Sequence, residues 1–192
     1  MSEQTKQNLR QQIQVERAKK TPAELITAGK SIANHDWAQL IVGENIACYA
    51  SWGNEPDTSE LRRTLISAGK RVFLPIIKPN SQMLWGVDQP PYFLNKFGIS
   101  EPEISDFGLD SADAVILPAL CADESGTRLG RGAGYFDRAL ANIPSFQLGG
   151  PMRIALLFDS EFLPTVPRDE HDELIDLVVT PTRTIRCKTV GG

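Results

Sequence analysis

The chain has 192 residues, of which 41% are apolar and 23% charged, and its formal net charge is −4. This length and balance predict one globular domain spanning residues 1–192. The negative charge argues against a nucleic-acid-binding protein, because affinity for a phosphate backbone needs concentrated Lys and Arg. No apolar run is long enough to span a membrane, and the polar beginning does not resemble an export signal. We therefore expect a cytoplasmic monomer without nucleic-acid or membrane partners.

The cysteines and histidines are few and scattered. Cys48, Cys121 and Cys187 lie in or beside apolar runs. An odd number of widely spaced cysteines is typical of small buried residues in a reducing compartment. With only His35 and His171 to assist them, a zinc site is not expected.

Residues 3–20 contain neither Gly nor Pro and predict a helix. At about 100° per residue, Lys6, Arg10 and Arg17 fall on one stripe of its surface. This cationic stripe is either a solvated helix face or part of an anion-binding site.

Helical and strand-like segments alternate through the rest of the chain. Residues 21–24 (TPAE) predict a capping box that opens a second helix running through Trp37. Asp57 or Thr58 is expected to cap a later helix, which ends at Gly69. The strand candidates are residues 45–51, the part of 57–77 that follows Gly69, and residues 83–87, 113–120, 153–158 and 176–180. Continuously apolar strands that alternate with helices predict an α/β fold with a mostly parallel sheet covered on both faces.

One connection and one loop stand out. Residues 78–111 are irregular and long enough to form a functional flap. The loop after the strand at 113–120 should lie at the carboxyl edge of the sheet, where ligands bind in open α/β sheets. There, Gly130, Gly132 and Gly134 occupy alternate positions. They allow backbone N–H groups to converge as an anion-binding nest before a helix, although an ordinary strand-to-helix turn would look alike.

Charged residues accompany this loop. Arg128 and Arg131 can supply charge-assisted hydrogen bonds to phosphate. Asp137 is either an ordinary first-turn acid or a ligand of a hydrated Mg²⁺ ion that bridges to phosphates. Glu55 is either a turn residue or a carboxylate that holds a polar heterocycle. The acidic residues 168–176 form either a solvated loop or the source of a second magnesium ligand.

Residues 117–141, LPALCADESGTRLGRGAGYFDRALA, resemble the signature of the 5-formyltetrahydrofolate cyclo-ligases, also called 5,10-methenyltetrahydrofolate synthetases. That signature is a proline-ended strand followed by R-L-G-x-G-x-G-Y-Y-D-R. The chain departs from it at Phe136, where a second tyrosine is usual, and at Ala133. Further matches in the family's order extend the resemblance over nearly the whole chain: Lys6 with Arg10, Glu55 with Thr58 (separated by Pro56-Asp57), GISEPE at 98–103, and HDELIDLVVT at 171–180.

The resemblance implies an enzyme that uses ATP and Mg²⁺ to convert 5-formyltetrahydrofolate, with or without a polyglutamate tail, into 5,10-methenyltetrahydrofolate. ADP and phosphate would be released after phosphorylation of the formyl oxygen and attack by N10. The resemblance also implies a single three-layer α/β domain of the class shared by ribose-5-phosphate isomerases and CoA-transferases.

The resemblance further assigns roles to individual residues. ATP would be bound by Lys6, Arg10, Arg128, Leu129, Gly130, Arg131, Gly132, Ala133, Gly134, Tyr135 and Phe136. The folate would contact Ala50, Glu55, Arg131, Gly132, Ala133, Gly134 and Tyr135. Asp137 and Asp172 would bind Mg²⁺, and the catalytic residues would be Arg131, Tyr135 and Asp137.

Two alternatives from other functional classes remain open. In an isomerase or CoA-transferase of the same fold, Glu55 would be the base or nucleophile, and Lys6, Arg10 and Asp137 would have no task. A non-catalytic nucleotide- or folate-binding module would keep the glycine loop without turnover.

Overall fold

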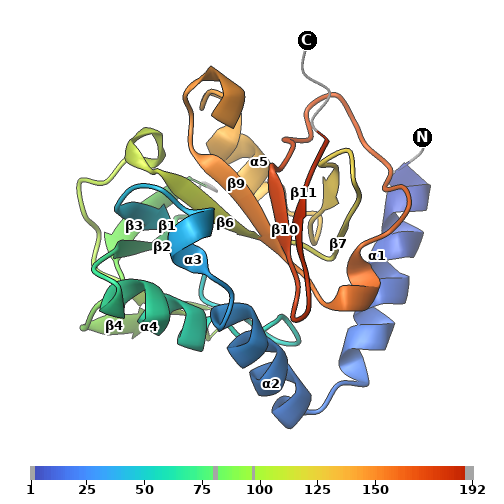
Figure 1. Ribbon diagram of the computed structural model, residues 1–192, viewed down its shortest axis with the longest axis horizontal. Helices are drawn as coiled ribbons and strands as arrows, with labels where there is room; N and C mark the ends of the chain where they lie inside the picture. Colours follow the sequence, from blue (N-terminus) through green and yellow to red (C-terminus); the bar gives the residue numbers. More distant parts are fainter. Residues whose placement is uncertain (1–2, 80–81, 97, 189–192) are drawn as a thin grey trace.

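A seven-stranded sheet forms the centre of the computed structural model, which describes residues 3–79, 82–96 and 98–188. The strand order is β11-β10-β9-β6-β1-β2-β3 (Figure 1). Strands β10, β9, β6, β1 and β2 run parallel, while β3 and β11 pair antiparallel at the two edges. The prediction of a mostly parallel sheet is therefore confirmed. The strands are β1 (Asn45–Ala47), β2 (Arg71–Ile77), β3 (Met83–Val87), β6 (Ala114–Pro118), β9 (Met152–Leu156), β10 (Leu177–Val179) and β11 (Thr184–Arg186).

Helices cover both faces of this sheet, which gives the three predicted layers (Figure 1). Alternate side chains of a strand point to opposite faces, so Val72 and Leu74 enter one apolar core and Phe73 the other. The first core is closed by helices α2 (Pro22–Ala33), α3 (Trp37–Leu40) and α4 (Ser59–Ser67). The second is closed by helix α5 (Tyr135–Leu140) and the 3₁₀ helix η1 (Leu109–Ser111). Two more 3₁₀ helices, η2 (Phe146–Leu148) and η3 (Asp159–Glu161), lie in the connections around β9.

Helix α1 (Glu3–Ala18) packs outside these layers, beside the hairpin of β7 (Cys121–Ala122) and β8 (Arg128–Leu129). Its Ile13 shares a small apolar cluster with Leu120 and Leu129. This packing holds α1 next to the segment that leads into the glycine loop. In the described ranges, neither α1 nor any other helix is long and apolar enough to cross a membrane.

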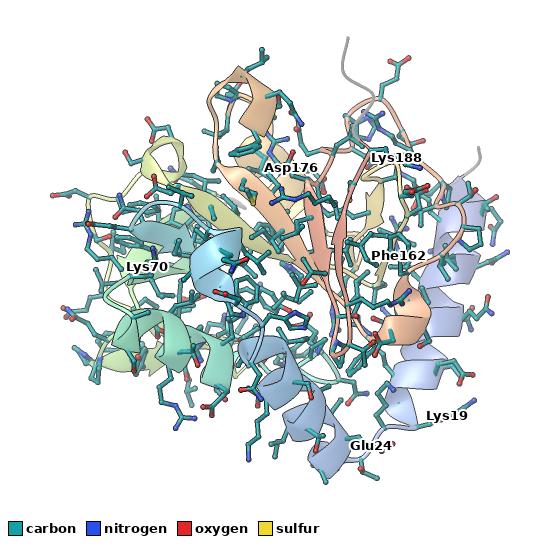
Figure 2. All side chains as sticks on the ribbon, viewed as in Figure 1. Lys19, Glu24, Lys70, Phe162, Asp176 and Lys188 are labelled. Atoms are coloured by element: carbon teal, nitrogen blue, oxygen red, sulfur yellow. The ribbon has the colours of Figure 1, made fainter. Side chains whose placement is uncertain are left out.

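The second predicted helix is divided in two. The capping box is present, because Thr21 Oγ1 accepts from the Glu24 backbone and Glu24, labelled in Figure 2, accepts from the Thr21 backbone. However, α2 ends at Ala33 rather than continuing through Trp37. Asp36 Oδ1 accepts from the Gln39 backbone N–H and so caps a separate helix, α3.

The first strand is shorter than the predicted 45–51. The Cys48 N–H still donates to Phe73 O, but Tyr49 O accepts from the Thr58 hydroxyl instead of from a neighbouring strand. Thr58 therefore stands at the start of α4 without capping it with its side chain. Asp57 Oδ1 accepts from the Ser59 N–H at 2.7 Å.

Part of the segment 78–111 that looked irregular is regular. Besides β3, it contains a hairpin of β4 (Tyr92–Leu94) and β5 (Ser100–Pro102). All three residues of β4 are exposed, so the alternation that reveals a strand is absent from its sequence. Glu101 Oε1 accepts from the Ile77 N–H, which joins the hairpin to the end of β2.

The three cysteines are free thiols, and Cys48 and Cys121 are fully buried as expected, whereas Cys187 is half-buried.

Candidate active site

A cavity of about 670 Å³ opens where the direction of the strand order changes. From β1 the chain moves to β2 on one side, and it later returns as β6 on the other side of β1. At such a switch point a crevice forms outside the carboxyl ends of the strands. Tyr49 and Ala50 after β1, and Pro118 and Ala119 at the end of β6, accordingly line the cavity.

Every residue predicted for the site lines this one cavity. They come from α1, the loop after β1, the segment from β8 into α5, and the loop before β10. The residues are Lys6, Arg10, Ala50, Glu55, Arg128, Leu129, Gly130, Arg131, Gly132, Ala133, Gly134, Tyr135, Phe136, Asp137 and Asp172. The fold therefore gathers them, while the individual roles stay predictions.

The glycine loop needs its bare backbone for its conformation. Gly132 (φ +101°) and Gly134 (φ +64°) adopt left-handed conformations that disfavour other residues. Arg10 packs beside the loop, because its guanidinium carbon would lie 3.5 Å from a Cβ at Gly132, an ordinary contact, and its Nε donates to Gly130 O at 3.2 Å. The helix that follows, α5, has only six residues, so its dipole contributes less to anion binding than expected.

Lys6 is buried against two acids rather than solvated. Its side chain is 5% exposed, and its Nζ lies 2.7 Å from Asp169 Oδ2 and contacts Asp172 Oδ2 directly. Burial alone would lower the pKa of Lys6, but the hydrogen bonds and charges of the two aspartates raise it above its usual value. The interpretation of this position as part of a solvated helix face is wrong.

Arg128 and Asp137 form a second ion pair. Arg128 Nη2 donates to Asp137 Oδ1 at 2.7 Å, and the arginine side chain is only 3% exposed. Burial lowers the pKa of Arg128, while the charges of Asp137 and Asp172 act to raise it. The Glu173 N–H also donates to Asp137, at 3.4 Å. Asp137 is therefore more than a first-turn acid interacting with a helix dipole.

Glu55 and Arg131 connect the loop after β1 to the glycine loop. Glu55 is 7% exposed, accepts from Arg131 Nε at 3.0 Å, and accepts from the Trp52 N–H at 2.9 Å. The Arg131 guanidinium also lies over the Trp52 ring, 5.0 Å from its centroid. Glu55 is thus a buried wall of the cavity rather than a plain turn residue.

The acids of the cavity fit a magnesium ion. Mg²⁺ is typically held by one or two carboxylates together with waters and substrate phosphates. Asp137 and Asp172 offer such carboxylates to the cavity. In the described part of the chain, the ligand atoms of Asp169, His171 and Asp172 lie within 4.8 Å of one another, and Asp137 is not part of this group. Asp169 and His171 were not predicted as ligands, although both belong to the acidic segment that the sequence singled out.

Other parts of the cavity wall were not predicted residue by residue. The β4–β5 hairpin and its turn contribute Asn95, Ile99 and Glu101, so the expected flap does form part of the site. Tyr49 also lines the cavity, and its buried hydroxyl has no hydrogen-bond partner among the described residues. Within an apolar strand sequence, no signal distinguished Tyr49 from a core residue.

Comparison with known proteins agrees with this geometry. The model of the "5-formyltetrahydrofolate cyclo-ligase family" matches residues 2–181. The chain belongs to this family. A family relative from Mycolicibacterium smegmatis, named 5-formyltetrahydrofolate cyclo-ligase, is 32% identical over 84% of this chain and 87% of its own length. The relative of the same name from Escherichia coli K12 is 29% identical over 85% of this chain and 93% of its own length.

Solved structures of the family share the fold. The NMR structure of Aquifex aeolicus 5,10-methenyltetrahydrofolate synthetase has a TM-score of 0.79 and 21% identity, covering 97% of this chain and 95% of that one. The synthetase of Mycoplasma pneumoniae has a TM-score of 0.69 and 20% identity, covering 92% and 98%. The predicted family, its enzyme class and the α/β architecture are thus confirmed.

Proposed function

We propose that the protein closes 5-formyltetrahydrofolate to 5,10-methenyltetrahydrofolate in a reaction that consumes ATP and requires Mg²⁺. One observation carries the proposal: a single cavity gathers the glycine loop, two candidate magnesium ligands and four cations. The cations come from two distant parts of the chain, Lys6 and Arg10 from α1 and Arg128 and Arg131 from the glycine-loop segment. Family membership supports the folate substrate. We also expect the protein to act as a cytoplasmic monomer without nucleic-acid or membrane partners.

The reaction requires the oxygen of a formyl amide to leave. When bound, ATP supplies a γ-phosphoryl group that makes this oxygen a leaving group, and attack by N10 on the formyl carbon then releases it as phosphate. Little covalent chemistry falls to the protein, so its residues act by positioning and by stabilising charge.

The triphosphate end of the cavity is its charged part. Arg128, from β8, and Lys6, from α1, line the cavity, and Arg10 Nε donates to the loop backbone at Gly130 O. Backbone N–H groups of the loop and these cations bind phosphate oxygens together. Asp137 and Asp172 would hold Mg²⁺ beside them.

The folate end is formed by the loop after β1 and the hairpin. Glu55 accepts hydrogen bonds from the amino-pyrimidine edge of the pterin, and Ala50 borders the same space. Arg131 and Tyr135, which also line the cavity, would orient the formyl group toward the phosphate. Apolar side chains from β2 and β3 (Pro75, Ile77 and Met83) complete a wall suited to aromatic rings.

The alternative enzyme classes explain fewer of these residues. A sugar-phosphate isomerase or CoA-transferase would use Glu55 as base or nucleophile and would not need the cations on α1. It would also leave the buried Lys6 and Asp137 without a task. A binding module without turnover would keep the same geometry, so only an assay separates it from the enzyme.

Replacing Glu55 with Gln is expected to weaken folate binding while leaving nucleotide binding nearly unchanged. A carboxylate accepts two N–H donors from a pterin, whereas an amide accepts at one atom only. Each lost charge-assisted hydrogen bond is worth roughly 1.5–3 kcal/mol, so 5-formyltetrahydrofolate should bind at least about tenfold more weakly. Calorimetric titration with each ligand separately measures both affinities.

Ribose 5-phosphate and an acyl-CoA serve as control ligands in the same titrations. Binding of either control by the wild-type protein, without binding of a magnesium–ATP analogue, would contradict the proposed function. Loss of nucleotide affinity in Glu55→Gln would place Glu55 at the phosphates instead.

A further inference from the structure

Each cation proposed to bind the triphosphate is already paired with an acid of the same cavity. The four cations contact five acids, because Lys6 has two acidic partners and each arginine has one. The pairs are Lys6 with Asp172 and Asp169, Arg10 with Glu3 at 2.6 Å, Arg128 with Asp137 at 2.7 Å, and Arg131 with Glu55 at 3.0 Å. The positive charge of the cavity is therefore neutralised from within.

Two of these pairs contain the candidate magnesium ligands, and their cations are buried. The side chains of Lys6 and Arg128 are 5% and 3% exposed. Removing one partner of a buried ion pair is strongly destabilising, because an uncompensated charge is left out of water. A metal ion that bound Asp137 would leave Arg128 without its acid, and one that bound Asp172 would leave Lys6 with Asp169 alone. A triphosphate that bound Lys6 and Arg128 would in turn leave Asp172 and Asp137 without their cations.

We propose that the site takes up the divalent cation and the triphosphate as one complex, by exchanging these two ion pairs. The carboxylates of Asp137 and Asp172 leave Arg128 and Lys6 and bind the metal. The two cations then bind phosphate oxygens instead. Every buried charge keeps a partner during this exchange. The inference rests on the proposed function, and it adds that free metal and free nucleotide each bind poorly because each must compete with an internal ion pair.

The exchange predicts that removing either member of a pair tightens binding of the ligand that competes for the other member. Without divalent cations, Asp137→Asn should tighten binding of the triphosphate, because Arg128 loses its internal competitor. Without nucleotide, Arg128→Met should tighten binding of the metal, because Asp137 becomes free. We expect each affinity to rise at least about fivefold, the low end of typical coupling between two sites.

The experiment measures two affinities in the full chain. A non-hydrolysable ATP analogue is titrated in EDTA at fixed salt by calorimetry, and Mn²⁺ alone is titrated by electron paramagnetic resonance. Lys6→Met repeats the metal titration on the second pair, and Asp172→Asn combined with Asp169→Asn repeats the nucleotide titration, because Lys6 contacts both acids. The inference therefore stays testable if one variant fails to fold. Circular dichroism checks the fold of each variant.

Two further variants control for the general field of the cavity. Glu101 lines the cavity, and in the described residues it forms no ion pair, while Arg138 lines it beside Asp137 in sequence and has no acid partner there. Glu101→Gln changes charge as Asp137→Asn does, and Arg138→Met changes it as Arg128→Met does. We expect Glu101→Gln to change nucleotide affinity, and Arg138→Met to change Mn²⁺ affinity, by less than about twofold, because Arg128 and Lys6 pair with Asp137, Asp169 and Asp172 and not with these side chains.

The outcomes separate the inference from the function on which it rests. If the wild type binds the analogue with Mg²⁺ but the paired variants change neither affinity, or change it no more than the controls, the exchange is overturned and the proposed function survives. If the wild type binds neither the analogue with Mg²⁺ nor 5-formyltetrahydrofolate, both are overturned. A rise in nucleotide affinity in the acid variants and in Mn²⁺ affinity in the cation variants, absent from the controls, supports the exchange.

Discussion

Replacing Asp137 with Asn is expected to lower turnover at least about 100-fold, because the variant keeps the shape of the side chain but removes the negative charge proposed to hold Mg²⁺. A factor of this size corresponds to about 2.7 kcal/mol of lost charge stabilisation in the transition state. Steady-state kinetics at several Mg²⁺ concentrations measures the loss. Wild-type turnover of the variant at ordinary Mg²⁺ concentrations would remove Asp137 from the metal site.

The same substitution should also destabilise the protein more than its place in α5 suggests. A first-turn acid stabilises a helix by about 0.3–1 kcal/mol. Asp137, however, is the partner of the buried Arg128, and loss of a hydrogen bond to a charged group costs roughly 1.5–3 kcal/mol. Urea unfolding checks this value. Asp106→Asn, at an exposed position outside the cavity, is the matched control and should change neither turnover nor stability.

Replacing Arg17 with Met is expected to cause a large loss of stability. Arg17 is 2% exposed, donates from Nε and Nη2 to Glu161 at 2.7 Å each, and donates from Nη2 to Ala119 O. Breaking a buried pair of this kind costs about 3–5 kcal/mol. In a chain of this length, that loss corresponds to a fall in Tm of roughly 6–20 °C.

The double variant Arg17→Met with Glu161→Gln is the control for this prediction. It removes both charges, and the glutamine oxygen can still accept from the Phe158 N–H, as Glu161 does. Its Tm should therefore lie above that of Arg17→Met alone. A double variant no more stable than the single one would show that the stranded carboxylate is not the cause of the loss.

Arg17 also illustrates what the sequence left undecided about α1. Helical periodicity correctly placed Lys6, Arg10 and Arg17 on one stripe. It did not reveal that the stripe faces the protein, because the acids that neutralise Lys6 and Arg17 are Asp172 and Glu161, far away in sequence. A cationic stripe without visible partners has the pattern of a solvated face.

The candidate site was more predictable than several elements of the fold. The glycine loop is a local motif that the sequence displays directly. The other site residues were found because short segments of the chain resemble the family's segments in the same order, and the cavity brings these residues together. The second helix was overextended because the Asp36 cap was overlooked. The strands β4 and β11 escaped prediction because both are short and largely exposed, so the apolar patterns that reveal buried strands are missing. Because β4 was not predicted, the hairpin that forms part of the cavity wall was not predicted either.

The most direct test of the central claim is to follow the absorbance of the methenyl product with purified protein and 5-formyltetrahydrofolate. We predict that the chromophore appears only when both ATP and Mg²⁺ are present, with one ADP formed for each ring closed. Ring closure at an equal rate with a non-hydrolysable ATP analogue would contradict the account.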